Sequence, residues 1–308
     1  SHAGFKSKQR SPQCPDLAKP AQPALLDAQQ VQGAMKDLSI DLSNAPPRSI
    51  GALRLGIGAA SRMQDFYQQG ALKALFPRSP LQDRALEATL INTSGGITGG
   101  DILNTSVTLS HTAKLTLSTQ ACERIYRASD GVPAQVITQL TASDQSQLHW
   151  LPQETLFYDG GRLNRQLDIR LSGQARLLAI ESLLFGRLAM GETHIHGHYS
   201  DTITLRIDDD LVWQDRTRLS GAVTELLDRP AIAAGARATA LLLFRAPEAE
   251  AMAGQLPALL NKTSGLSYLG QDLLVIRILA PDGLSLRRML FPILSTLSGG
   301  NLPRCWRL

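Results

Sequence analysis

Three closely spaced histidines, His194, His196 and His198, are the residues whose spacing first suggests metal chemistry. On a strand all three imidazoles would project from one face, with neighbours about 6–7 Å apart and the outer two about 13 Å apart. Imidazole is a ligand for nickel, copper or zinc. Only neighbouring pairs could share an ion unless Gly197 bends the chain. The segment therefore predicts either a metal site of at most two ligands or an ordinary solvated strand face.

A glycine-rich segment, Asn92 to Asp101, contains two glycine pairs and ends in a carboxylate. The exposed backbone N–H groups of such a loop can bind phosphate. A phosphate loop also needs a lysine followed by serine or threonine, which this segment lacks, and Asp101 would repel the anion. The glycines favour a hairpin or bulge with positive φ, or a close backbone approach to a partner.

The sequence lacks the residue patterns of common catalytic centres. It contains no GxSxG, HExxH or Walker A pattern, and no histidine has an obvious nucleophile partner. Gly56-Ile57-Gly58 follows a predicted strand, but Ser61 stands where a dinucleotide-binding motif has its third glycine. These observations predict that the protein is not an enzyme.

Two other functions remain as alternatives. A metal-dependent hydrolase could use His194, His196 and His198 with Glu192, although such a centre needs three ligands and this cluster offers at most two per ion. A carbohydrate- or peptide-binding β module would need an aromatic-lined groove, which an aromatic content of 5% disfavours.

Two carboxylates lie beside apolar segments and therefore need a partner. Glu181 ends an apolar predicted strand, and Glu192 follows the segment 186–191. Arg187 is the obvious cation for this role.

Composition indicates a globular protein of the cytoplasm. The three cysteines, Cys14, Cys122 and Cys305, are far apart and include no CxxC pair, which fits a reduced compartment. The 31 basic and 27 acidic residues are interspersed, which argues against nucleic acid as a partner. The first 40 residues lack the apolar stretch of a signal peptide, and the most apolar window, 231–244, is too short to span a membrane.

Short apolar or alternating runs recur about every ten residues from Gly51 onward and predict a mainly β protein with a few α-helices. The runs are bounded by Gly, Asn, Asp or Pro and predict a strand-rich, multi-layer sheet architecture whose C-terminal part is mixed α/β. Parallel βαβ units are disfavoured because few gaps could hold a crossover helix. The predicted strands are 53–57, 86–91, 103–109, 114–118, 135–140, 147–151, 167–171, 176–181, 202–207, 211–213, 238–244 and 273–279.

Helices are predicted in only a few places. Residues 247–261 begin with a proline and two glutamates that suit a helix N-terminus, and 284–297 have an apolar stripe that ends at Gly299-Gly300. Residues 1–45 contain little apolar periodicity apart from a short helical pattern at 25–38, and predict a flexible extension before a domain at 46–308.

Seven short motifs follow one another along residues 46–308. They are Asn92 to Asp101, Thr119-Gln120 with Tyr126-Arg127, Trp150 to Glu154, Glu181, Gly186-Arg187 with Gly191-Glu192, Asp215-Arg216, and Leu302 to Trp306.

In order and approximate spacing these motifs resemble the UreD (also called UreH) family of urease accessory proteins. The resemblance implies a scaffold without activity of its own that binds UreF and UreG and docks on apo-urease. It implies no permanently bound cofactor but nickel in transit through an internal passage, and it allows a homodimer of the accessory complex. Neither a nucleic acid nor a membrane is an expected partner.

Four carboxylates are candidates for the passage: Asp101, Glu181, Glu192 and Asp215. Single carboxylates attract a divalent cation and release it again. We also expect alanine substitutions of Asp101 and of Glu181 to affect nickel transfer and not stability. Finally, Trp306 and Arg304 in the C-terminal tail are candidates for the partner interface, because tryptophan and arginine are enriched at binding hot spots.

Overall fold

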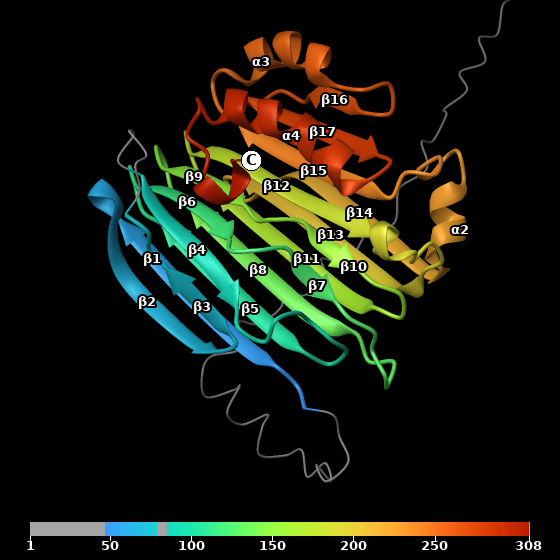
Figure 1. Cartoon of the computed structure of the whole chain (residues 1–308). Coiled ribbons are helices and arrows are strands. Elements are labelled where there is room, and N and C mark those ends of the chain that lie inside the picture. Colours follow the sequence, from blue (N-terminus) through green and yellow to red (C-terminus); the bar gives the residue numbers. More distant parts are fainter. Residues whose placement is uncertain (1–46, 79–84, 308) are drawn as a thin grey trace, which may run out of the picture. The chain divides into compact units, whose positions relative to one another are not determined.

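The computed structural model describes residues 47–78 and 85–307, so the predicted extension at 1–45 and its short helix lie outside the described residues. The chain divides into the units Ser1–Pro47 and Arg48–Leu308. The second unit contains all described helices and strands, and it consists mostly of β-strands (Figure 1). The predicted mainly β fold is confirmed. No helix in the described ranges is long and apolar enough to cross a membrane.

Two sheets make up this unit (Figure 1). The first, sheet A, has seven strands in the order β14 (Asp210–Ala222), β13 (His196–Ile207), β11 (Arg162–Leu171), β8 (Ala134–Ala142), β5 (Ile102–Leu109), β1 (Ile50–Gly58) and β2 (Arg62–Gly70). The second, sheet B, runs in the order β16 (Gly265–Tyr268), β17 (Leu273–Ala280), β15 (Ala238–Arg245), β12 (Arg176–Phe185), β9 (Gln147–Leu151), β6 (Lys114–Thr119), β4 (Leu86–Asn92) and β3 (Leu72–Leu75). Two short strands, β7 (Glu123–Ile125) and β10 (Thr155–Phe157), extend it beside β12.

Many neighbouring strands are parallel, although no described α-helix connects them. In sheet A, β1, β5, β8, β11 and β13 are parallel, and in sheet B so are β4, β6, β9 and β12. The chain passes from one sheet to the other between them, as in β4, β5 and β6. A strand of the opposite sheet therefore supplies the crossover that a helix supplies in βαβ units.

Alternating side chains explain the packing of the two sheets. Strand β5 alternates between exposed or half-exposed residues and the buried Leu103, Thr105, Val107 and Leu109, so only one of its faces packs against sheet B. Strand β12 is buried on both faces, because helices cover the other side of sheet B.

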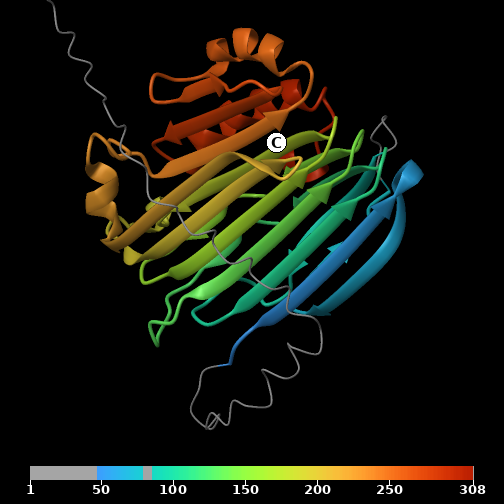
Figure 2. The same ribbon diagram turned by 180° about the vertical axis from the view of Figure 1, so that it is seen from behind.

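These helices are α3 (Ala249–Gln255) and α4 (Gly283–Leu297) (Figure 1). Asp282 caps α4 by accepting a hydrogen bond from the Ser285 backbone N–H at 2.7 Å. Helix α3 is shorter than the predicted 247–261, because a 3₁₀ turn with Pro257 follows at Leu256–Leu259. The outer face of sheet A has no described helix over it (Figure 2).

Sequence patterns missed one exposed strand and several short elements. Strand β2 is exposed along its whole length and shows no apolar alternation, and β3, β7, β10 and β16 are only three or four residues long. The six-residue helix α2 (Val223–Asp228), directly after β14, was also not predicted.

Candidate functional site

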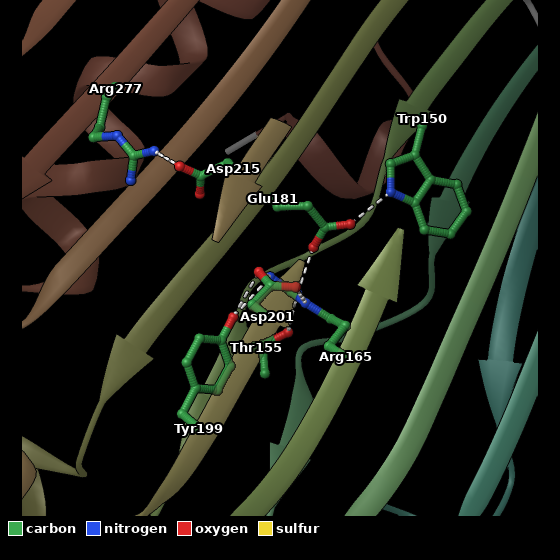
Figure 3. Close-up of polar contacts among 8 residues, drawn as sticks. All are labelled: Trp150, Thr155, Arg165, Glu181, Tyr199, Asp201, Asp215 and Arg277. Atoms are coloured by element: carbon green, nitrogen blue, oxygen red, sulfur yellow. Dashed lines mark hydrogen bonds and ion pairs between the residues drawn. The ribbon is translucent and has the colours of Figure 1, made fainter. Parts of the chain in front are cut away.

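Arg165 lies on the inner face of β11, between the buried Leu163 and Leu167. Its side chain is only 9% exposed, so the guanidinium needs partners inside the protein. The parallel register of β11 and β13 places Asp201 directly beside it, and Glu181 reaches it from β12 of the other sheet. Figure 3 shows these charges converging between the sheets.

The arginine binds both carboxylates. Its Nη1 donates to Glu181 Oε2 at 2.5 Å, and its Nε and Nη2 donate to the two Asp201 oxygens at 3.1 and 2.6 Å (Figure 3). Tyr199 accepts from Arg165 at 2.9 Å and donates its hydroxyl to Asp201 at 3.0 Å. Trp150 Nε1 donates to the remaining Glu181 oxygen at 2.8 Å. Each carboxylate oxygen in the cluster therefore has a donor.

The cluster has one cation for two carboxylates. Burial alone would lower the pKa of Arg165, but Asp201 and Glu181 raise it well above its ordinary value, so the guanidinium stays charged. Burial raises the pKa of Glu181, and the charge of Arg165 opposes this shift. Counted by formal charge, one guanidinium faces two carboxylates, so the cluster can attract further positive charge.

Two cavities between the sheets meet at this cluster. One of about 300 Å³ is lined by residues including Trp150, Thr155, Arg165 and Glu181. The other, of about 210 Å³, is lined by residues including Arg165, Glu181 and Asp201. Because both cavities share Arg165 and Glu181, the ion pair stands at the junction between them.

Each cavity contains a further carboxylate. In the second, Asp215 of β14 binds Arg277 of β17 at 2.5 Å, a pair without net charge (Figure 3). In the first, both oxygens of Glu123 accept from Asn92 Nδ2 at 3.2 Å. Burial raises the pKa of Glu123 to about 7. Glu181 and Asp215 were predicted for this role, whereas Glu123, Arg165 and Asp201 were not.

The comparisons with known proteins agree with the resemblance found in the motifs. The model of the UreD urease accessory protein family matches residues 49–307. The chain belongs to this family. Proteins named urease accessory protein UreD are similar to it: that of Ruegeria pomeroyi is 42% identical over 82% of this chain and 97% of its own length. That of Roseobacter denitrificans is 43% identical over 85% of this chain and 96% of its own length.

Asp101, in the family's glycine-rich motif, lines neither cavity. It is 3% exposed, and its two oxygens accept backbone hydrogen bonds from Ser49 at 2.7 Å and Thr98 at 2.8 Å. Gly95, Gly96 and Gly100 of this motif have positive φ, as expected for glycine-built turns. The expectation that Asp101 has little effect on stability is not supported, because its loss would leave two N–H groups without their acceptor.

Glu192, in the family's Gly-Glu motif, is also outside both cavities. Its predicted partner is confirmed: Arg187 donates to it through Nε at 3.1 Å and Nη2 at 3.0 Å. Hydrogen bonding to Arg187 lowers the pKa of Glu192, which keeps it ionised. Glu192 also accepts from the Asp159 backbone at 3.1 Å, so it fastens two surface loops.

The three histidines do not share one strand face, because β13 begins only at His196 and His194 lies before it. The Nε2 atom of His198 is 3.2 Å from Asn164 Oδ1, while the Nδ1 atom of His196 is 3.9 Å from Asp159 Oδ1. In the described part of the chain no three His, Cys, Asp or Glu side chains are grouped to hold a metal ion. The expectation of three aligned imidazoles is wrong, and the hydrolase alternative loses its support.

Trp306, in the family's C-terminal motif, is completely buried, so its prediction as an interface residue is wrong. Its Nε1 donates to the Leu151 carbonyl at 2.9 Å, and the Arg287 guanidinium lies 4.7 Å from its ring centre. The tail packs against sheet B and α4 through this side chain. Arg304 of the same 3₁₀ turn is exposed and remains a candidate for partner contact.

Proposed function

We propose that the protein is a non-catalytic scaffold that binds UreF and UreG, docks on apo-urease and passes nickel between its two sheets to the urease active site. The junction of the two cavities at Arg165 and Glu181 carries this proposal. Nickel is cargo in this scheme, so the protein needs sites that attract a divalent cation without retaining it.

The carboxylates between the sheets suit such transport. Glu123, Glu181 and Asp215 are distributed over the two cavities and do not converge on one point, so none offers the several ligands that make a tight site. The excess negative charge at Glu181 and Asp201 favours entry of a cation. Arg165 competes for the same two carboxylates, which limits how long an ion stays.

Closing the second cavity would test the passage. Thr217 lines this cavity, so Thr217→Trp should block nickel while the scaffold still assembles. The measurement is urease activity and nickel per apo-urease after coexpression with UreF and UreG, with assembly followed by size-exclusion chromatography. Thr108→Trp, on the exposed side of β5, is the matched control.

We expect at least a tenfold loss of activation for Thr217→Trp and less than twofold for the control. Normal nickel content in an assembled Thr217→Trp complex would refute a route through this cavity. Loss of assembly in both variants would instead refute the scaffold geometry.

A further inference from the structure

Three of the arginines on the outer face of sheet A, the side opposite the cavities, lie near one another on β11 and β14. Thr217 of β14 lines the second cavity, so its neighbours Arg216 and Arg218 point the other way. On β11, Leu163 is buried in the core, so Arg162 also points outward. We call Arg162, Arg216 and Arg218 the arginine face.

The arginine face is not neutralised by the described residues. None of its three guanidinium groups forms an ion pair there, whereas Arg165 and Arg277 on the inner side both do. His198 lies among them: burial and the charges of Arg218 and Arg162 lower its pKa, which keeps the imidazole neutral. From strand spacing and rise, the Cα atoms of the three arginines fall within about 16 Å of one another.

The surroundings of these arginines are polar. Strand register places Asn164 beside Ser200 and Arg218, and Gln166 beside Thr202 and Arg216. The carboxylate of the adjoining Asp168 already accepts hydrogen bonds from Gln166 and Thr204. Farther along the same face, Arg170 and Arg206 lie beside the hairpin turn of Asp208 and Asp209, and Arg206 donates to the Asp209 carbonyl.

Among the polyanions that could bind here, an acidic protein surface fits best. The outward positions of β11, β13 and β14 contain no Phe, Tyr or Trp on which nucleic-acid bases could stack. They also present little apolar surface for insertion into a membrane. Short amide and hydroxyl side chains can instead pair with protein groups, while arginine forks bind carboxylates in a bidentate manner.

We infer that the arginine face docks the acidic surface of an assembly partner, one that presents at least three carboxylates on an area about 16 Å across. The inference rests on the proposed function because it assumes that the protein works within an assembly. It concerns the opposite side of the sheet from the nickel passage and does not require it.

Charge reversal on the full-length chain tests the inference. Binding of immobilised wild-type protein, Arg216→Glu/Arg218→Glu and the control Arg229→Glu/Arg288→Glu would be measured against purified apo-urease, UreF and UreG at 50 and 300 mM NaCl. The control arginines are exposed and lie off this face. Arg216→Gln/Arg218→Gln separates loss of positive charge from added repulsion, and melting temperatures verify folding.

We expect the Glu double variant to raise the Kd for one probe at least tenfold and the Gln double variant to raise it several-fold. The control should stay within twofold, and salt should weaken wild-type binding more than variant binding. Equal binding of all variants to every probe bound by wild type would overturn the inference alone. Failure of wild type to bind any probe would overturn both it and the scaffold proposal.

Two further probes, a 20-base-pair DNA duplex and phosphatidylserine vesicles, test the rival polyanions. If the reversal weakens only their binding, the face is a site for another anion and the inference is wrong. A chain lacking residues 1–46 that binds the same probe more tightly, with the gain abolished by the reversal, would show that this segment occupies the face. That result would overturn the inference as well.

Discussion

The two faces of strands β11, β13 and β14 use arginine in opposite ways. On the inner face Arg165 is shielded from water and held by Glu181 and Asp201, whereas on the outer face Arg162 and Arg218 have no described ion-pair partner. A buried charge must be compensated within the chain because burial removes its hydration. An exposed one need not be, so it stays available to a second molecule. Substitutions in the inner cluster should therefore lower the stability of the fold, whereas substitutions of the outer arginines should not.

Removing the inner cation should have the largest effect. Arg165→Met leaves Glu181 and Asp201 buried without their cation, and we expect it to lower the free energy of unfolding by about 3–5 kcal/mol. Urea denaturation at pH 7.5 would measure this. Adding Glu181→Gln and Asp201→Asn should restore most of the loss. If Arg165→Met alone is as stable as wild type, the inner face does not depend on charge compensation.

The pH dependence of folding stability provides a test of Glu123 on the inner side of the sheets. Its pKa in the folded protein is about 7, above the ordinary 4.5, so burial of the charged form opposes folding. This contribution is absent below about pH 4.5, where Glu123 is protonated in both states, and grows to its full size as pH rises past 7. Glu123→Gln should stabilise the protein at pH 8 by at most about 3 kcal/mol and hardly at all at pH 4.5. Equal effects at both pH values would contradict this.

Asp101 separates a structural carboxylate from those of the passage. Asp101→Ala removes the acceptor of two backbone N–H groups, and we expect a destabilisation of about 1–3 kcal/mol. Nickel per assembled urease complex should be unchanged, because Asp101 lines neither cavity. Asp101→Asn, which keeps one acceptor oxygen, should be intermediate in chemical denaturation. A loss of nickel transfer without a loss of stability would instead support a role for Asp101 in the passage.

The outer face should give the smallest stability effect. Arg218→Met exposes no buried charge, and its melting temperature should correspond to a change within about 0.5 kcal/mol of wild type. Differential scanning calorimetry beside Arg165→Met would compare the faces directly. A destabilisation of Arg218→Met above about 2 kcal/mol would remove the contrast between them.

Much of this fold could be predicted because apolar runs and helical periodicity are local signals. Strand β9 has the predicted bounds 147–151, and α4 begins one residue before the predicted 284–297. The parallel order of the strands could not be predicted, since neighbours in one sheet are separated in sequence by a strand of the other. Residue types do not encode that pairing.

Only part of the candidate site could be predicted from the sequence. Glu181 and Asp215 were predicted from the family motifs. Arg165 and Asp201 could also have been found, because each is a charged residue at an inward position of an alternating strand. A charge at an inward position predicts an internal ion pair. Trp306 was misjudged because a large side chain at a chain end suits both a hot spot and a core.

The alternation of the chain between the sheets also limits how the cavities can open. The chain crosses repeatedly between sheet A and sheet B, as in β8, β9, β11, β12 and β13, so many covalent connections join the two layers. Among the described residues, these repeated connections oppose a hinge motion of one sheet away from the other. Widening of the space between them must come from rotamer changes at single side chains, and Arg165 at the junction is the one whose rotation would matter most.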